Sequence, residues 1–237
     1  PLGWRSWNLY GKNVNQELIQ SIMKGMTDAS RTVDGKPTSL LDLGYSDVGL
    51  DDNWQVCDSE GHYHDESGYP VVNTTLFPDM KGMTDYAHSL NLTAGFYGNN
   101  CICADASISD KKYYEGDVQA FLDFGYDSWK LDGCGAQTDL SLWDSLLSDA
   151  GKKVVIENCH WGSCNPYEPE MRDGKLWCPW NFYRTSGDVS ARYVSIISNL
   201  ATVRKYAESN LTVPGCWAYP DMLEVGNFAS SPAALAY

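Results

Sequence analysis

The chain has 237 residues, of which 43% are hydrophobic and 13% aromatic, so it can bury one sizeable core. Its 31 acidic residues outnumber 17 basic ones, and the net charge of −14 argues against nucleic acid or an anionic membrane surface as partner. No apolar run approaches the ~20 residues that a membrane-spanning helix needs. This balance suits a secreted or acidic-compartment protein that acts on a neutral ligand.

Strand-like and helix-like patterns alternate along the chain. In chain order, the first half predicts a strand over 4–10, a helix over 14–29 capped by Asn13, a strand over 45–50, a helix over 79–90, a strand over 92–97, a helix over 112–124 and a strand over 126–132. The second half predicts a helix over 140–150, a strand over 154–158, an irregular run leading to 180–188, a helix over 193–208 and a strand over 211–217.

About seven such alternations without a break in composition predict a parallel α/β fold. Each strand is followed by a loop with aromatic and acidic residues, as in a (β/α)8 TIM barrel, which gathers its site at the carboxyl ends of its strands. A doubly wound sheet would need a glycine-rich phosphate turn, and the sequence has none. Seven strands are visible and an open barrel edge is costly, so we expect a fragment truncated before the last strand-helix unit.

Eight cysteines and three N-x-[S/T] sequons indicate an oxidising, glycosylating route. The sequons lie at Asn73, Asn91 and Asn210. Paired C-x-x-C sites do not occur, so a structural zinc cluster is not expected. The chain opens at Pro1, directly before a strand-like run and without a signal peptide, so we expect a trimmed N-terminus.

The strand over 126–132 carries Lys130 and Asp132, whose side chains share one face because they are two residues apart. A lysine beside a carboxylate favours the ionised form. An ionised, oriented carboxylate at a strand end is what a glycosidase nucleophile requires. The alternative is an ordinary ion pair at a strand-to-loop junction.

Further aspartates follow other predicted strands. Asp51 and Asp52 are adjacent, and such a pair can accept hydrogen bonds from vicinal sugar hydroxyls, unless it caps a helix or lies in a solvated loop. Asp188 would supply the second carboxylate that glycoside hydrolysis needs, unless it caps the following helix. Asp221 carries the same ambiguity.

Aromatic residues within or after strand ends offer apolar platforms that suit sugar rings, although a single aromatic residue is more often core packing. They are Trp7, Tyr97, Trp161 and Trp217. The four histidines are dispersed, so no metal-ligand spacing emerges. His62 and His64 lie in a long polar loop and are expected to be solvated, whereas His160 is a candidate acid/base or metal ligand.

Six segments together resemble the α-galactosidases (melibiases) of glycoside hydrolase family 27 in order and spacing. They are 3–8 (GWRSWN), 50–55 (LDDNWQ), 129–134 (WKLDGC), 159–162 (CHWG), 184–188 (RTSGD) and 220–226 (PDMLEVG). The resemblance implies that Asp132 is the nucleophile and Asp188 the general acid/base. It also implies residues that bind the terminal sugar: Trp7, Asp51, Asp52, Tyr97, Lys130, His160, Trp161, Arg184 and Asp221.

The same resemblance implies two disulfides, Cys101–Cys134 and Cys159–Cys178, and leaves the other cysteines unassigned. Two departures bear on specificity. His160 occupies a position where family members usually carry Glu or Asn, and Ser163 falls near the position that separates galactose from N-acetylgalactosamine enzymes. The preference at the sugar 2-position therefore stays open.

What the resemblance implies is a retaining hydrolase that removes terminal α-D-galactose and needs no cofactor and no metal. The alternatives are an α-N-acetylgalactosaminidase and a non-catalytic galactose-binding barrel. Residues 1–237 would form an incomplete catalytic barrel domain without the family's C-terminal β-sandwich. The expected partner is a small-molecule, oligosaccharide or glycoconjugate substrate, and a homodimer is left open. The expected location is outside the cell, in a lysosome or in a vacuole.

Overall fold

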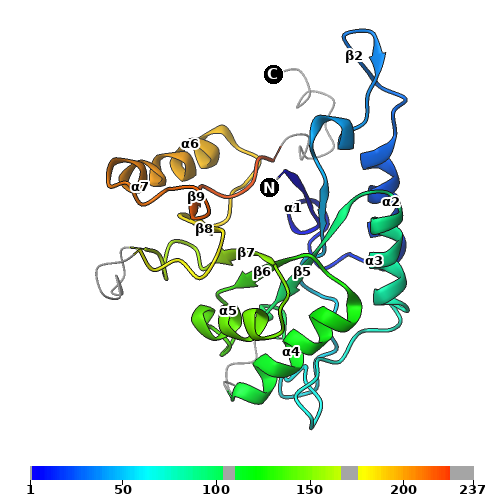
Figure 1. Ribbon diagram of the computed structural model, residues 1–237, viewed down its shortest axis with the longest axis vertical. Helices are drawn as coiled ribbons and strands as arrows, with labels where there is room; N and C mark the ends of the chain where they lie inside the picture. Colours follow the sequence, from blue (N-terminus) through cyan, green and yellow to red (C-terminus); the bar gives the residue numbers. More distant parts are fainter. Residues whose placement is uncertain (1, 104–109, 167–175, 225–237) are drawn as a thin grey trace. The chain divides into compact units, whose positions relative to one another are not determined.

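A computed structural model describes residues 2–103, 110–166 and 176–224 of the chain (Figure 1). These residues fall into two compact units, Pro1–Val155 and Ile156–Tyr237.

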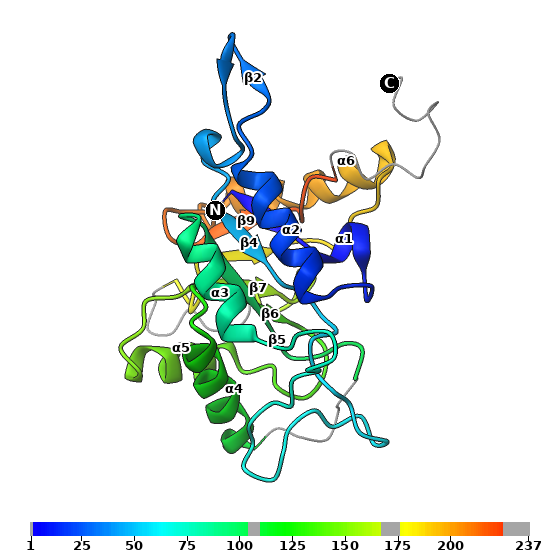
Figure 2. The same ribbon diagram turned by 90° about the vertical axis from the view of Figure 1, so that its right-hand side faces the viewer.

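The first unit is built on four parallel strands in the order β1 (Gly3–Arg5), β4 (Asp47–Gly49), β5 (Thr93–Gly98) and β6 (Ser128–Asp132). Its helices are α1 (Trp7–Tyr10), α2 (Gln16–Thr27), the 3-10 helix η1 (Leu41–Leu43), α3 (Met80–Ser89), α4 (Lys111–Phe124) and α5 (Leu140–Asp149). Helices α2 to α5 pack successively on one another beside the sheet (Figures 1 and 2). An antiparallel hairpin of β2 (Thr32–Val33) and β3 (Lys36–Pro37) points away from the sheet in both views.

Side-chain caps begin three of these helices, because the first amides of a helix have no partner within it. Asn15 accepts from Leu18 N at 2.8 Å and begins α2, so the predicted cap at Asn13 is wrong by two residues. Asp79 begins α3, and Asp139 begins α5.

An aromatic core between the sheet and the helices fixes which face of β6 is buried against them. Trp129 is fully buried and stacks on Phe121 of α4, with ring centroids 4.9 Å apart, and also contacts Trp143 of α5. Because alternate residues of a strand face opposite ways, Lys130 and Asp132 lie on the face turned away from this core.

The second unit contains three further parallel strands in the order β7 (Val155–Cys159), β8 (Phe182–Arg184) and β9 (Trp217–Tyr219), with helices α6 (Tyr193–Thr202) and α7 (Arg204–Glu208). Seven parallel strands are thus present in the described residues, as predicted. In those same ranges, no helix is both long and apolar enough to cross a membrane.

Three predicted elements differ from the structure. The strand over 4–10 is wrong after Arg5, since Trp7–Tyr10 is a helical turn. The helix over 193–208 is divided at Val203 into two helices. The strand over 211–217 is wrong, because Val213 and Cys216 pair across a tight turn and β9 begins only at Trp217.

Candidate active site

An acidic cluster lies at the carboxyl ends of β4, β5 and β6 in the first unit. Asp51 and Asp52 follow β4, Lys130 and Asp132 belong to β6, and Tyr97 lies near the end of β5. Neighbouring parallel strands end at the same edge of a sheet, so residues distant in sequence meet there. Asp51 and Asp52 are each 1% exposed and Asp132 is 6% exposed, which excludes the solvated-loop alternative.

Lys130 supplies a buried positive charge to this cluster. Its Nζ donates to Asp51 Oδ2 at 2.7 Å and lies 3.9 Å from Asp132 Oδ2. The shared strand face predicted the approach to Asp132, but the closer partner is Asp51. Asp51 N in turn donates to Ser6 Oγ at 3.0 Å, so the end of β4 is also tied to the turn after β1.

Both oxygens of the Asp132 carboxylate are oriented by donors. Gly133 N donates to Oδ1 at 2.8 Å, and the hydroxyl of Tyr97 donates to Oδ2 at 2.9 Å. Burial raises the pKa of Asp132 above its ordinary value, against the lowering by Lys130, while Asp51 raises it further. Burial also raises the pKa of Tyr97 well above its usual range, so its hydroxyl remains a donor.

Asp52 fixes the loop that follows β5. Its Oδ2 accepts from Cys101 N at 3.1 Å and Ile102 N at 3.0 Å, and its Oδ1 accepts from Asn53 N at 2.7 Å. Burial raises the pKa of Asp52 to about 6, although these amides lower it. The neighbouring charge of Asp51 adds to the rise.

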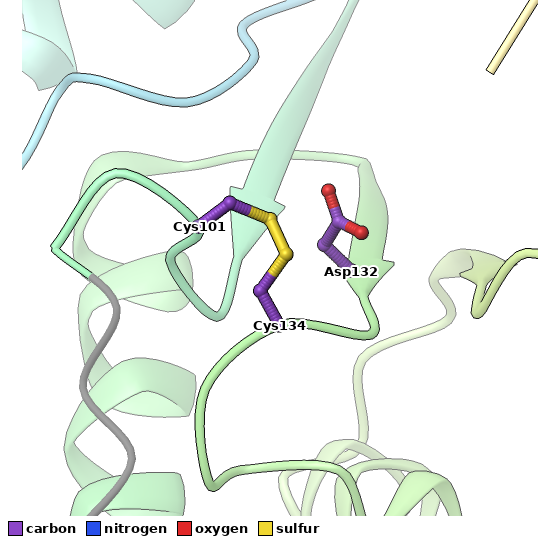
Figure 3. Close-up of side chains that lie close together, drawn as sticks. All are labelled: Cys101, Asp132 and Cys134. Carbon is purple, nitrogen blue, oxygen red and sulfur yellow. A yellow bond between two sulfur atoms is a disulfide. The ribbon is translucent and has the colours of Figure 1, made fainter.

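The Cys101–Cys134 disulfide lies directly beside Asp132 (Figure 3). It joins the loop after β5 to the loop after β6, as the family resemblance implies. Within the described ranges, Cys101, Asp132 and Cys134 are the one group of His, Cys, Asp and Glu side chains close enough to share an ion. Because the two sulfurs are bonded to each other, they offer no thiolate ligands to a metal.

The implied disulfide between Cys159 and Cys178 is wrong. Cys178 is bonded to Cys216, with Cα atoms 6.2 Å apart. A further disulfide joins Cys57 to Cys103. The Cys178–Cys216 bond ties the segment before β8 to the residue before β9, a connection that spacing alone does not reveal.

A second group of charged side chains lies at the carboxyl ends of β8 and β9 in the second unit. Arg184 ends β8, and its Nη2 donates to Asp188 Oδ1 and lies 3.3 Å from Asp221 Oδ2. Its Nη1 donates to Cys159 Sγ at 3.1 Å. Although burial opposes the charge, Cys159, Asp221 and Asp188 raise the pKa of Arg184 above its ordinary value.

Asp188 and Asp221 differ in exposure and in partners. The Asp188 side chain is 66% exposed, whereas that of Asp221 is 6% exposed and accepts from Val189 N at 2.8 Å. Helix α6 begins after Arg192 without a side-chain cap, so the alternative of Asp188 as its cap is wrong. Each aspartate instead binds the Arg184 guanidinium.

Three further predicted sugar-binding residues differ in their exposure. Trp7 opens α1 and is partly exposed, His160 is buried directly after β7, and Trp161 is 42% exposed. Sequence reasoning missed Glu157 of β7, which accepts a hydrogen bond from the hydroxyl of Tyr219 in β9. A carboxylate inside a predicted strand was the available signal.

The prediction that His64 is solvated is wrong. Its side chain is fully buried, and Nε2 lies 3.0 Å from Asp117 Oδ1. His62, by contrast, stays partly exposed beside Asp58.

Buried carboxylates and a lysine at the carboxyl ends of parallel strands are an arrangement that glycoside hydrolases built on a (β/α) barrel use. The family described as Alpha galactosidase A matches residues 1–234. The chain therefore belongs to the alpha-galactosidase family of glycoside hydrolases.

Individual relatives agree with this family and with the predicted barrel. An alpha-galactosidase of Oryza sativa is 29% identical over 98% of this chain and 52% of its own length. The structure of an alpha-galactosidase from Saccharomyces cerevisiae is 22% identical, with a TM-score of 0.77 over 97% of this chain and 53% of that one. A structure of an alpha-galactosidase from Saccharomyces cerevisiae with raffinose gives a TM-score of 0.75 at 21% identity, over 97% of this chain and 53% of that one. The (β/α)-barrel fold class is confirmed, and the chain spans about half the length of these relatives.

Proposed function

We propose that the protein containing this chain is a retaining α-galactosidase, which releases terminal α-D-galactose by double displacement on two carboxylates. Residues 1–237 then belong to its catalytic barrel domain. The observation that carries the proposal is the buried Asp132 carboxylate at the end of β6, oriented by Tyr97 and Gly133 beside the charge of Lys130, in a chain of this family.

Asp132 is the proposed nucleophile. Its oxygen attacks the anomeric carbon as the bond to the leaving oxygen breaks, which gives a covalent glycosyl-enzyme. A nucleophile must be ionised and fixed, and the three neighbours support both conditions. Lys130 favours the ionised carboxylate, while Tyr97 OH and Gly133 N hold its two oxygens.

Asp188 is the proposed general acid/base. It gives a proton to the leaving oxygen in the first step and takes one from the attacking water in the second, which restores both carboxyl groups and releases α-galactose. The exposure of its side chain supports proton exchange with solvent. Its hydrogen bond from the buried Arg184 limits its orientation.

The proposed sugar contacts come from charged and aromatic residues at strand ends. Carboxylates and cations suit sugar hydroxyls, and an aromatic face suits the apolar face of the ring. They are Trp7, Asp51, Asp52, Tyr97, Lys130, His160, Trp161, Arg184 and Asp221.

We further propose a location outside the cell, in a lysosome or in a vacuole, because three disulfides persist only under oxidising conditions. Asn91 and Asn210, two of the three sequon positions, are exposed and so accessible to glycosylation.

The test compares Asp132→Ala with Asp127→Ala in the full-length protein, using an aryl α-galactoside as substrate. Both changes remove an aspartate near β6, but Asp127 precedes the strand and pairs with His88 at the opposite end. We expect at least a ~1,000-fold loss of kcat for Asp132→Ala only. Azide, a small external nucleophile, should restore turnover to that variant.

Retention of more than a few per cent of activity by Asp132→Ala would contradict the nucleophile assignment. Galactose binding without turnover by the wild-type protein would instead indicate a non-catalytic binding barrel. Faster turnover of the aryl α-N-acetylgalactosaminide than of the galactoside would indicate the other 2-position preference.

A further inference from the structure

A chain of buried polar side chains supports the loop that follows the nucleophile, residues 133–139 between β6 and α5. Asn99 begins this chain directly after β5, and its Nδ2 donates to the backbone oxygens of Asp132 at 3.2 Å and Gln137 at 3.0 Å. These two carbonyls lie before and near the end of the loop. One side-chain amide therefore ties the loop to the end of β5 at two points.

Gln137 continues the chain away from the nucleophile. Its Nε2 donates to Asp117 Oδ2 at 2.8 Å, and its Oε1 accepts from the hydroxyl of Tyr63 at 2.8 Å. Both ends of its amide are thus used, and Gln137 and Asp117 are almost completely buried. The side chain of Gln137 is held by α4 on one side and by the long polar loop on the other.

His64 completes the chain. Its Nε2 lies 3.0 Å from the second oxygen of Asp117, and because a carboxylate accepts, this nitrogen carries the proton. The His64 ring also packs on Tyr63, with centroids 4.1 Å apart. The side chain that sequence reasoning expected in solvent is therefore an internal support for Asp117.

This arrangement costs more to bury than an apolar core of the same shape would cost. A hydrogen-bonded polar network, however, specifies one arrangement of its members where apolar packing tolerates several. A nucleophile needs that specificity, since a misplacement of ~1 Å can cost ~100-fold in rate.

We propose that Gln137 is a positioning residue for Asp132, an inference that rests on the proposed function. Asp117 and Tyr63 fix the Gln137 side chain and thereby its backbone carbonyl. That carbonyl orients the Asn99 amide, whose other hydrogen bond holds the backbone of Asp132. The chemistry at the carboxylate thus depends on a residue that touches neither substrate nor reacting atoms.

The test measures kcat and KM of full-length Gln137→Met on an aryl α-galactoside. Methionine matches glutamine in length but offers neither hydrogen bond. Misplacement of the nucleophile slows attack without weakening sugar contacts, so we expect kcat to fall ~10- to 100-fold with KM within about twofold of wild type. Release of the aryl group in the first turnover should slow by the same factor.

The matched control is Tyr114→Phe. Its hydroxyl accepts from Asp139 N at 3.1 Å, at the far end of the same loop, so this change removes a hydrogen bond but leaves both hydrogen bonds of the Asn99 amide in place. We expect kcat of Tyr114→Phe to lie within twofold of wild type.

Tyr63→Phe keeps Gln137 but removes one of its two partners. This change should lower kcat by less than Gln137→Met does, with KM again unchanged.

Equal kcat values for Gln137→Met, Tyr114→Phe and the wild type would overturn the inference. A loss of kcat/KM in Gln137→Met that comes from a higher KM alone would overturn it as well. If Gln137→Met does not fold, unchanged kcat in Tyr63→Phe overturns it. Failure of the proposed function gives a different result, because Asp132→Ala would then keep its activity or the wild type would show none.

Discussion

The charge of Lys130 offers the sharpest electrostatic prediction. Lys130→Met keeps the length of the side chain but removes the buried cation between Asp51 and Asp132. Both carboxylates then lie in a buried site with no lysine. We expect the pKa of Asp132 to rise further above its ordinary value.

The magnitude follows from the 3.9 Å between Nζ and Asp132 Oδ2. At an effective dielectric constant of ~20, unit charges at that distance interact by about 4 kcal/mol, and one pKa unit corresponds to about 1.4 kcal/mol. Because Lys130 lies closer to Asp51 and is shared with it, we expect the pKa of Asp132 to rise, but by less than this interaction alone would give.

A rise in the pKa of Asp132 affects the acidic limb of the pH profile. A carboxylate nucleophile must be ionised, so if Asp132 has the proposed role, activity should be lost as pH falls through its pKa. A higher pKa therefore moves the acidic limb of kcat/KM to higher pH. The assay follows aryl α-galactoside hydrolysis by the full-length protein across pH, with thermal melting to define the folded range.

Lys112→Met is the matched control, because it removes one positive charge from an exposed lysine whose Nζ contacts Glu66 O at 3.4 Å. Its acidic limb should coincide with that of wild type. An unmoved acidic limb in folded Lys130→Met would refute the electrostatic role of Lys130. Removing one partner of a buried pair should also lower stability by ~3–5 kcal/mol.

Two further predictions concern stability. Burial raises the pKa of Asp52 in the folded state from 3.8 to about 6, so the unfolding free energy should fall by about 3 kcal/mol as pH rises from about 4 to 6. Chemical denaturation across this pH range should show a flatter fall for Asp52→Asn. Equal slopes for the variant and the wild type would contradict the prediction. Replacing Cys101 and Cys134 by Ser opens a loop of sequence separation 33 and should lower stability by about 4 kcal/mol and also lower kcat. Replacing Cys57 and Cys103, with a separation of 46, should lower stability by a similar amount with a smaller effect on kcat. Equal losses of kcat would show that the bond beside Asp132 has no special role.

The carboxylates at strand ends could be predicted from the sequence because their signals are local. A short strand that ends on an acid, as at Asp132, places the side chain at the carboxyl edge of a parallel sheet. The pair Asp51 and Asp52 follows β4 in the same way. The structure adds their burial, which no local pattern states.

Pairings between distant residues could not be predicted in the same way. The closer partner of Lys130 lies 79 residues away, and that of His64 lies 53 residues away. A polar loop composition predicts solvation for His64, but the composition cannot reveal a buried carboxylate on α4. The partner of Cys178 was misassigned for a similar reason, since pairing depends on Cα separation in space.

The acidic cluster of the first unit holds three aspartates and one lysine, and the lysine is not shared equally among them. Lys130 binds Asp51 most closely, while Asp132 is held by Tyr97 OH and Gly133 N as well as by the more distant charge. Asp52 has a pKa of about 6, so acidification neutralises it and removes one of three mutually repelling charges. An acidic medium therefore favours the folded cluster, and protonation of Asp132, whose pKa is also raised, adds to this effect while it removes the ionised carboxylate that the proposed mechanism needs. The buried chain from Asn99 to His64 reaches the same residue through the backbone oxygen of Asp132, whereas Lys130 and Asp51 act on the charge of its carboxylate.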